Sequence, residues 1–266
     1  MFDRFLSTLS LVSRFPIKRR FSFDPSWVDF YLPITGIGPA LLGALTFGGV
    51  YLLTKSSLIT VLFTLIVQYL GFNLFHFDGL VDTADGFLGT FDREKRFAVL
   101  KDSRIGVYGL FAGMAALSLK AALLYTLFPA LVRFPAPLLA YPISGRFSAA
   151  LIPCLTGPAK LSGLGALTKD ARPHRAIAGL LTGLFLWTAL VWGISAFIAI
   201  GEPSYGPACI LLAVPVVSPL VSVFFARMYR KHLGGYTGDA LGAAVELAEL
   251  IHLAAALVVL EWIVPS

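Results

Sequence analysis

The chain has 266 residues, of which 57% are hydrophobic and only 14% are charged. Because ordinary soluble domains carry about 25% charged residues, this composition excludes a typical soluble enzyme and a disordered chain. The formal net charge is +6. The basic residues gather between apolar segments, which indicates membrane topology and gives no reason to expect a nucleic-acid partner.

Apolar segments long enough to cross a bilayer, which takes about 20 residues, recur along the whole chain. No stretch between them is long or polar enough to form a separate soluble domain. We therefore expect an all-α, polytopic helical bundle that makes one integral membrane domain of residues 1–266. Seven transmembrane helices are expected, at residues 31–53, 57–77, 105–128, 135–155, 176–200, 206–226 and 241–263.

Residues 1–30 form a basic segment before the first expected span. Its charged start is not followed by the small-residue pattern of a cleavage site, so we expect no cleavable signal peptide. Its apolar residues instead recur on one helical face, which predicts a short amphipathic helix on the membrane surface. These apolar residues are Phe2, Phe5, Leu6, Leu9 and Val12.

Most basic residues lie in every second connection, where four alternate segments hold 17 of the 21 lysines and arginines. Basic loops stay on the cytoplasmic side of a membrane. We therefore expect a cytoplasmic amino terminus, an external carboxyl terminus and chemistry at the cytoplasmic face. The four segments are residues 1–30, 78–104, 156–175 and 227–232.

Three aspartates follow the second expected span. On a helix, Asp78, Asp82 and Asp85 fall within about 60° of one another. Like charges at the end of a membrane helix repel each other, and a divalent cation would turn the cluster into a site. A hydrated loop with structural salt bridges is the alternative. His76 lies about 160° around the same helix from Asp78, so packing is favoured over metal ligation for it.

The rest of the 78–104 connection combines glycine with positive charge. Gly86 and Gly89 are expected to end or kink the helix, so that the chain folds back and brings Asp102 towards the other aspartates. Lys101 and Arg104 then become candidate partners for a phosphate held by Mg²⁺. Membrane topology alone is the alternative explanation for both basic residues.

A second motif starts the last span. Glycines at 234, 235 and 238 allow close backbone approach, and free N–H groups there can meet an anion. Asp239, Glu246 and Glu249 share one helical face. Carboxylates inside an apolar span suggest function. The alternative is that the glutamates pair with Arg146 or Lys120 as buried links between helices.

In order and spacing, these motifs resemble those of the cobalamin synthase family, the adenosylcobinamide-GDP ribazoletransferases. The resemblance rests on residues 76–86, 101–109 and 234–249 and extends over nearly the whole chain. Phe77 stands where the family usually has leucine, which changes little. Ser162 stands where the family usually has an acidic residue before Gly163-Leu164-Gly165, which weakens any role for that connection.

The resemblance implies a Mg²⁺-dependent phosphotransfer in the last steps of cobalamin biosynthesis. The 3′-hydroxyl of α-ribazole, or of its 5′-phosphate, attacks the phosphorus attached to the cobinamide arm of adenosylcobinamide-GDP, and GMP leaves. The expected location is the bacterial plasma (inner) membrane, with the lipid bilayer and other enzymes of the pathway as partners.

Roles follow for individual residues. Four aspartates are expected to bind the Mg²⁺ ion that contacts the diphosphate. Two of these aspartates and two basic residues are expected to be catalytic. The expected metal ligands are Asp78, Asp82, Asp85 and Asp102, and the expected catalytic residues are Asp82, Asp85, Lys101 and Arg104. The expected substrate-binding residues are Lys101, Ser103, Arg104, Gly235, Thr237, Asp239 and Glu249.

Two other functions compete with this one. A CDP-alcohol phosphatidyltransferase also uses aspartates on membrane helices, but its motif opens Asp-Gly-x-x-Ala-Arg, whereas Asp82-Thr83 stands at the last two places here. A cation-coupled transporter could use the charges inside the predicted spans. Transporters usually show repeated halves with paired broken helices, and we find no such pairing.

Overall fold

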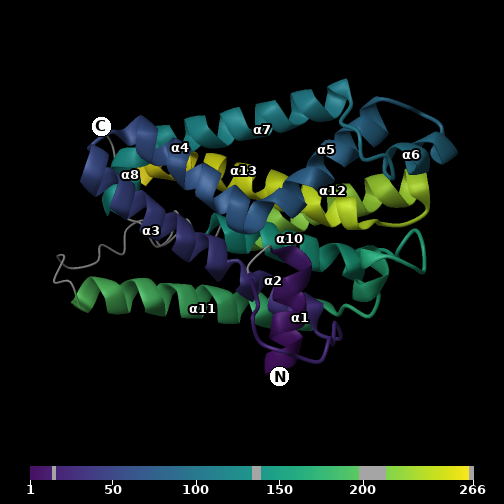
Figure 1. The fold of residues 1–266 in the computed structure, drawn as a ribbon, viewed down its shortest axis with the longest axis horizontal. Helices are drawn as coiled ribbons and strands as arrows, with labels where there is room; N and C mark the ends of the chain where they lie inside the picture. The colour runs from purple at the N-terminus through teal and green to yellow at the C-terminus, as the bar shows by residue number, and fades with distance from the viewer. Residues whose placement is uncertain (14–15, 134–138, 198–213, 264–266) are drawn as a thin grey trace.

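The computed structural model describes residues 1–13, 16–133, 139–197 and 214–263, and in these ranges the chain is helical with one isolated β-bridge (Figure 1). Its helices in chain order are α1 (Phe2–Val12), α2 (Val28–Thr35), α3 (Ile37–Thr54), α4 (Ser57–Gln68), the π-helix η1 (Tyr69–Asn73), α5 (Leu74–Leu88), α6 (Arg93–Val99), α7 (Val107–Thr126), α8 (Phe128–Arg133), α10 (Tyr141–Leu155), the 3₁₀-helix η2 (Leu164–Thr168), α11 (Pro173–Phe197), α12 (Val214–Leu233) and α13 (Gly238–Ile263).

Five helical stretches in the described residues are long and apolar enough to cross a membrane. They agree with five of the seven predicted spans, so the prediction of an all-helical fold is confirmed for the described residues, with five candidate membrane helices. The five stretches are Val28–Thr54, Ser57–Leu88, Val107–Thr126, Pro173–Gly193 and Gly238–Glu261.

The second of these stretches is longer than predicted. We expected the span to end at residue 77, but α4, η1 and α5 form one continuous helical stretch that ends at Leu88. Gly86 therefore lies inside α5, and Gly89 is the residue that caps it. The aspartates consequently sit on a regular helix, where their angular positions are fixed by its geometry.

The two remaining predicted spans do not reach this length in the described residues. α10 has 15 residues, fewer than the predicted 135–155 span, part of which lies outside the described residues. Much of the predicted 206–226 span also lies outside them, and α12 extends beyond it to a basic last turn at residues 230–232.

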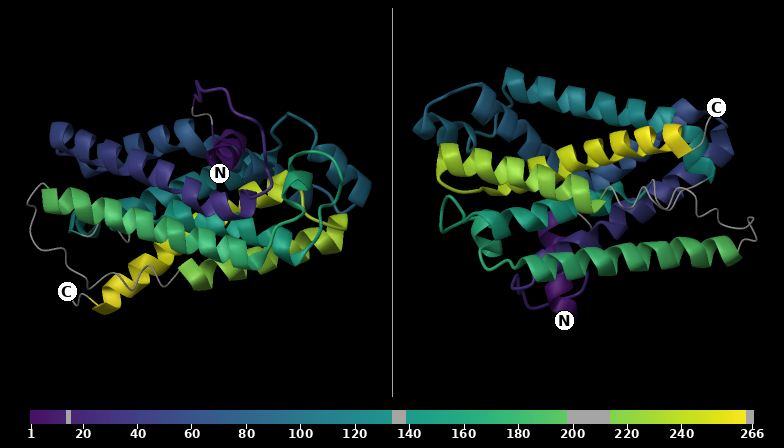
Figure 2. Two further views of the ribbon diagram at one scale, coloured as in Figure 1. Left: turned by 90° about the horizontal axis from the view of Figure 1, so that it is seen from below. Right: turned by 180° about the vertical axis from the view of Figure 1, so that it is seen from behind.

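α10 is the central helix of the bundle. It contacts α2, α3, α11, α12 and α13, and nearly all its side chains are buried. In Figures 1 and 2, α7 and α11 lie on opposite sides of the molecule, with α10 and α13 between them. Serines join α10 to α12 across this core, Ser144 to Ser218 and Ser148 to Ser222, as small polar residues commonly do in membrane bundles.

α1 runs across the long axis of the bundle, as Figures 1 and 2 show. It buries Leu6 and Val12 and leaves Phe2 exposed. The segment after it is tied back to α1, because the Arg4 guanidinium donates a hydrogen bond to Asp24 at 2.8 Å. The predicted amphipathic helix therefore forms, and it lies against the side of the bundle.

Candidate active site

Two glycines let α5 and α13 cross in backbone contact. A Cβ atom on Gly79 would lie 2.8 Å from the carbonyl oxygen of Asp239, and one on Gly242 would lie 2.9 Å from that of His76. Any larger residue at either position would force the helices apart. The crossing brings the first turns of α13 against the middle of α5, and so brings Asp239 near the α5 aspartates.

Asp82 is the centre of the resulting acidic cluster. The carboxylates of Asp78, Asp239 and Asp85 are near enough to repel the negative charge of Asp82. Asp78 is exposed, while Asp82 and Asp239 are half-buried. Within the described part of the chain, neither Asp78 nor Asp82 has a hydrogen-bond or ion-pair partner, whereas Asp239 accepts a hydrogen bond from the Thr237 hydroxyl at 3.0 Å. The repulsion among these carboxylates is therefore left uncompensated by the protein.

Asp85 has a different environment from the other two aspartates of α5. It is 8% exposed, and its carboxylate accepts hydrogen bonds from the backbone N–H groups of Gly106 and Gly109, each at 2.8 Å. These are donors at the start of α7, where free N–H groups and the helix dipole favour a negative charge. Asp85 therefore caps α7 from a neighbouring helix. The two glycines three residues apart were the signal in the sequence that could have indicated this role.

Asp102 and Arg104 pair with each other. The Arg104 guanidinium donates to Asp102 through two nitrogens, the shorter contact being 2.6 Å, and these hydrogen bonds lower the pKa of Asp102 to about 2. Both residues line a pocket of about 510 Å³ together with Asp85, so the chain does fold back after α6. Ser103, between them, is exposed.

The structure does not bring the four predicted metal ligands together. Across residues 1–13, 16–133, 139–197 and 214–263, no three His, Cys, Asp or Glu side chains are placed to hold a metal ion. The carboxylate of Asp85 accepts a hydrogen bond from the start of α7, and the carboxylate of Asp102 is paired with Arg104. What remains is Asp78 and Asp82, with Asp239 beside them.

Lys160, from the basic 156–175 connection, lies beside Lys101 at the surface. The two side chains come from different connections, and partial desolvation together with the Lys101 ammonium lowers the pKa of Lys160. The Lys160 ammonium also lies 4.3 Å from the centre of the Phe97 ring. Neither lysine has an acidic partner in the described ranges. Two adjacent unpaired ammonium groups favour an anionic ligand.

The loop before α13 is held by the connection that follows α10. The backbone N–H of Ala159 donates to the Tyr236 carbonyl at 2.8 Å, and the N–H of Tyr236 donates to Gly157 at 3.0 Å. The Tyr236 hydroxyl donates to the Gly165 carbonyl. Gly235 packs so tightly on this connection that a Cβ atom would lie 2.5 Å from the Gly157 carbonyl oxygen. The 157–168 connection thus positions residues 235–239, a role that its motif did not indicate.

The segments that carry Lys160 and Lys101 contact the segments that carry the acidic cluster. Lys160 directly follows Ala159, which is bonded to Tyr236 three residues before Asp239. Lys101 directly follows Leu100, whose side chain packs within 3.2 Å of the Cβ position of Gly86, one turn beyond Asp82. The end of α5, the connections on either side of α6 and the start of α13 therefore lie at one end of the bundle (Figure 1).

Glu249 and Glu246 lie deeper in the bundle, in a network of charges that are all 0% exposed. The Lys120 ammonium bonds Glu246 at 2.8 Å and Glu249 at 2.7 Å, and Arg146 bonds Glu249 at 3.3 Å. The Tyr69 hydroxyl, from η1, donates to Glu246 at 2.5 Å. This is the arrangement of buried links between helices that the sequence left open, and Glu249 has no open side from which to contact a substrate.

Comparisons with known proteins agree with the sequence motifs. The model of the CobS family, described as cobalamin-5-phosphate synthase, matches residues 4–257. Proteins named adenosylcobinamide-GDP ribazoletransferase are similar over most of both chains. That of Shewanella amazonensis is 33% identical, covering 94% of this chain and 92% of its own, and that of Thermosipho melanesiensis is 31% identical, covering 90% and 92%.

A third relative of the same name, from Rhizobium etli, is 35% identical over 84% of this chain and 80% of its own. No solved structure matches the chain. The family model covers far more than half of the sequence. The chain therefore belongs to the CobS cobalamin-5-phosphate synthase family, the adenosylcobinamide-GDP ribazoletransferases, and is an enzyme of cobalamin biosynthesis.

Proposed function

We propose that the acidic cluster and the two lysines form the active site for phosphotransfer from adenosylcobinamide-GDP to α-ribazole or its 5′-phosphate. The ribose 3′-hydroxyl attacks the phosphorus on the cobinamide arm. A new phosphorus–oxygen bond forms to ribazole as the bond to the bridging oxygen breaks, so that GMP leaves with that oxygen and the attacking hydroxyl loses its proton. The observation that supports this site is a pair of carboxylates, Asp78 and Asp82, that have no partner in the described residues and lie beside Asp239.

The carboxylates fit a magnesium ion. Mg²⁺ is usually held by one or two protein carboxylates, with waters and substrate phosphates as its other ligands. Asp78 and Asp82 are free to serve, because nothing in the described chain bonds them. When bound, Mg²⁺ would neutralise charge on the diphosphate oxygens as it builds up. Of the four predicted metal ligands, we therefore propose only Asp78 and Asp82, with Asp239 as the neighbouring carboxylate.

The protein's own groups would carry the remaining work. Lys101 and Lys160 bind the guanylate end of the diphosphate, where their charge favours the departing phosphate. Asp239, which accepts a hydrogen bond from the Thr237 hydroxyl, would accept the proton of the attacking hydroxyl. Holding both substrates in line supplies much of the rate enhancement in such reactions, because there is little covalent chemistry for the protein to do.

We further propose that α10 and α12 cross the membrane with the five long stretches, which restores seven spans. α10 is short but sits at the centre of the bundle, and α12 carries its basic turn at the end where the other basic connections lie. The positive-inside rule then places that end, and the active site, in the cytoplasm of a bacterial inner membrane protein. Cysteine-accessibility labelling at Lys160 and Lys55 tests the orientation, because only the former should be protected in sealed right-side-out vesicles.

The proposed reaction is tested by turnover of the detergent-purified chain. Adenosylcobinamide-GDP and α-ribazole are supplied with and without Mg²⁺, and GMP and the cobalamin product are followed together. We expect equal amounts of both products, and only with the metal. Release of GMP without a matching cobalamin product would contradict the transfer, and equal turnover after removal of divalent ions with a chelator would contradict the metal.

A further inference from the structure

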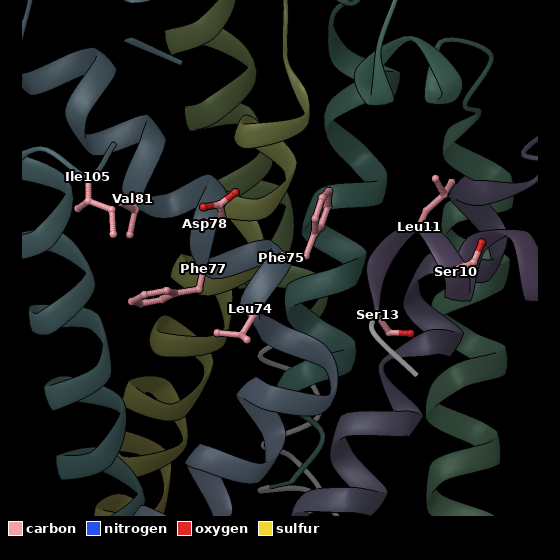
Figure 3. Close-up of a pocket in the computed structure, with 9 residues that line it drawn as sticks. All are labelled: Ser10, Leu11, Ser13, Leu74, Phe75, Phe77, Asp78, Val81 and Ile105. Atoms are coloured by element: carbon pink, nitrogen blue, oxygen red, sulfur yellow. The ribbon is translucent and has the colours of Figure 1, made fainter. Parts of the chain in front are cut away.

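A pocket of about 590 Å³ lies beside Asp78, between α5 and the surface helix α1 (Figure 3). Leu74, Phe75 and Asp78 of α5 lie in the middle of the view, Ser10, Leu11 and Ser13 lie on the α1 side, and Val81 with Ile105 lies on the other. The pocket thus brings together the amino-terminal segment and the acidic motif, which are more than 60 residues apart in sequence.

The lining of this pocket is mostly apolar and includes two aromatic rings, those of Phe75 and Phe77. Its single charged side chain is Asp78, and the nine lining residues include no lysine or arginine. A diphosphate would meet a carboxylate and no compensating cation there. The pocket therefore suits a neutral, flat, aromatic group whose polar end reaches Asp78.

The size of the pocket distinguishes between the two substrates. Pockets that bind small molecules measure about 300–1,000 Å³, and this one is near the middle of that range. A nucleoside fits within it. A cobinamide carrying a guanosine diphosphate is several times larger than a nucleoside and does not. The occupant that matches both size and chemistry is the acceptor.

We propose that this pocket binds the nucleoside part of the acceptor, with its aromatic base against Phe75 and its ribose 3′-hydroxyl directed into the acidic cluster of Asp78, Asp82 and Asp239. This inference rests on the proposed function. In-line displacement requires the attacking and leaving oxygens on opposite sides of the phosphorus. The acceptor enters from the α1 side of Asp78, while the guanylate is held by Lys101 and Lys160. α1 is then a wall of the acceptor site, and its residues contribute to selection of the base.

The experiment measures acceptor binding separately from turnover. α-Ribazole is titrated calorimetrically into the purified full-length chain without the second substrate, and the KM of each substrate is measured in parallel. Leu11→Trp fills the pocket, and Phe75→Ala removes the ring that contacts the base. Phe111→Ala is the matched control, because Phe111 is an exposed phenylalanine on α7 that does not line the pocket.

We expect Leu11→Trp and Phe75→Ala to raise the Kd and the KM for α-ribazole by about tenfold or more, since base–aromatic contacts are worth that much, while the KM for adenosylcobinamide-GDP changes less than about twofold. Phe111→Ala should change neither. Melting temperatures in detergent verify that each variant is folded, and two variants with opposite effects on pocket volume make a shared folding defect recognisable.

Three outcomes would overturn the inference. The first is an unchanged Kd for α-ribazole in both folded variants, and the second is a parallel rise in both KM values. The third is loss of a co-purified lipid from the Leu11→Trp protein with normal nucleoside binding, which would make the pocket a lipid site. Failure of the proposed function itself looks different, because the unaltered chain would then produce no cobalamin at all.

Discussion

α13 carries two groups of carboxylates that look alike in the sequence and differ completely in their surroundings. Glu246 and Glu249 are fully buried and bonded to Lys120 and Arg146. Asp239, two and three turns earlier, lies half-buried beside Asp78 and Asp82, which have no partner in the described residues. A carboxylate in a membrane protein must be neutralised by something. In the deep group the protein supplies the opposite charge, and in the outer group the described residues supply none.

The difference has a physical consequence for stability. A buried ion pair that is complete costs little or stabilises little, but removing one partner leaves an isolated buried charge. Unpaired carboxylates that repel one another destabilise the fold until a cation binds, which is typical of sites shaped for function. Stability and activity should therefore respond in opposite ways to changes in the two groups.

The largest expected effect on stability is that of Glu246→Leu. It leaves Lys120 and Arg146 with one carboxylate between them, and breaking a buried pair in this way costs about 3–5 kcal/mol of unfolding free energy. The double variant Lys120→Met with Glu246→Leu restores neutrality and should recover most of the loss. Melting temperatures in detergent measure both. If the double variant were less stable than the single one, the pairing would not be what holds these helices together.

The largest expected effect on activity is that of Asp82→Asn. Loss of one electrostatic contact to a developing charge lowers the rate by about 10²–10³. The melting temperature in the absence of Mg²⁺ should stay the same or rise, because the substitution removes a repulsive charge. Glu94→Gln, an exposed carboxylate-to-amide change on α6, is the control and should leave kcat/KM unchanged. Full activity of Asp82→Asn at saturating Mg²⁺ would remove this residue from the metal site.

Asp85→Asn separates the role of capping from that of metal binding. An asparagine side chain has one acceptor oxygen for the two N–H groups of Gly106 and Gly109, so one donor loses its partner. Loss of a cap typically costs about 1 kcal/mol, and up to about 2. We expect a lower melting temperature and an unchanged Mg²⁺ concentration for half-maximal activity. A raised Mg²⁺ requirement would instead make Asp85 a metal ligand, as the sequence analysis expected.

Asp78, Asp82 and Asp85 show which features of the site can be predicted from the sequence. Their spacing predicted correctly that they share one side of a helix, since helical geometry depends only on sequence separation. Which neighbouring helix each side chain meets depends on packing, and a small rotation decides it. Asp82 lies near Asp239 of α13, whereas Asp85 accepts a hydrogen bond from Gly109 of α7. Spacing alone could not show that Asp85 is already satisfied.

The basic residues were harder still to interpret. Lysines in the connections between the predicted spans are explained equally well by membrane topology, so Lys160 carried no separate signal of a binding role. Its position follows from the backbone pairing of Ala159 with Tyr236, which joins segments about 77 residues apart and has no local sequence signature. By contrast, the apolar runs predicted five long spans well, because a bilayer imposes both length and composition.

The smallest expected effect is that of Asp102→Asn, which tests whether Asp102 belongs to either group of carboxylates. Its partner Arg104 is 87% exposed, so solvent screens their interaction. The Arg104 hydrogen bonds lower the pKa of Asp102 to about 2, against an ordinary value of about 3.9. Stabilisation by a carboxyl with a lowered pKa is fully present above the ordinary pKa and is lost as the pH falls through the folded value.

The difference in melting temperature between Asp102→Asn and the unaltered chain should therefore be small and constant from about pH 5 to pH 9, and should shrink only between about pH 4 and pH 2. The Mg²⁺ requirement should not change either, because Asp102 already has a cationic partner in Arg104. Were the variant to need much more Mg²⁺ for activity, Arg104 would have to release Asp102 when substrate binds. Asp102 would then join the acidic cluster only when substrate is bound.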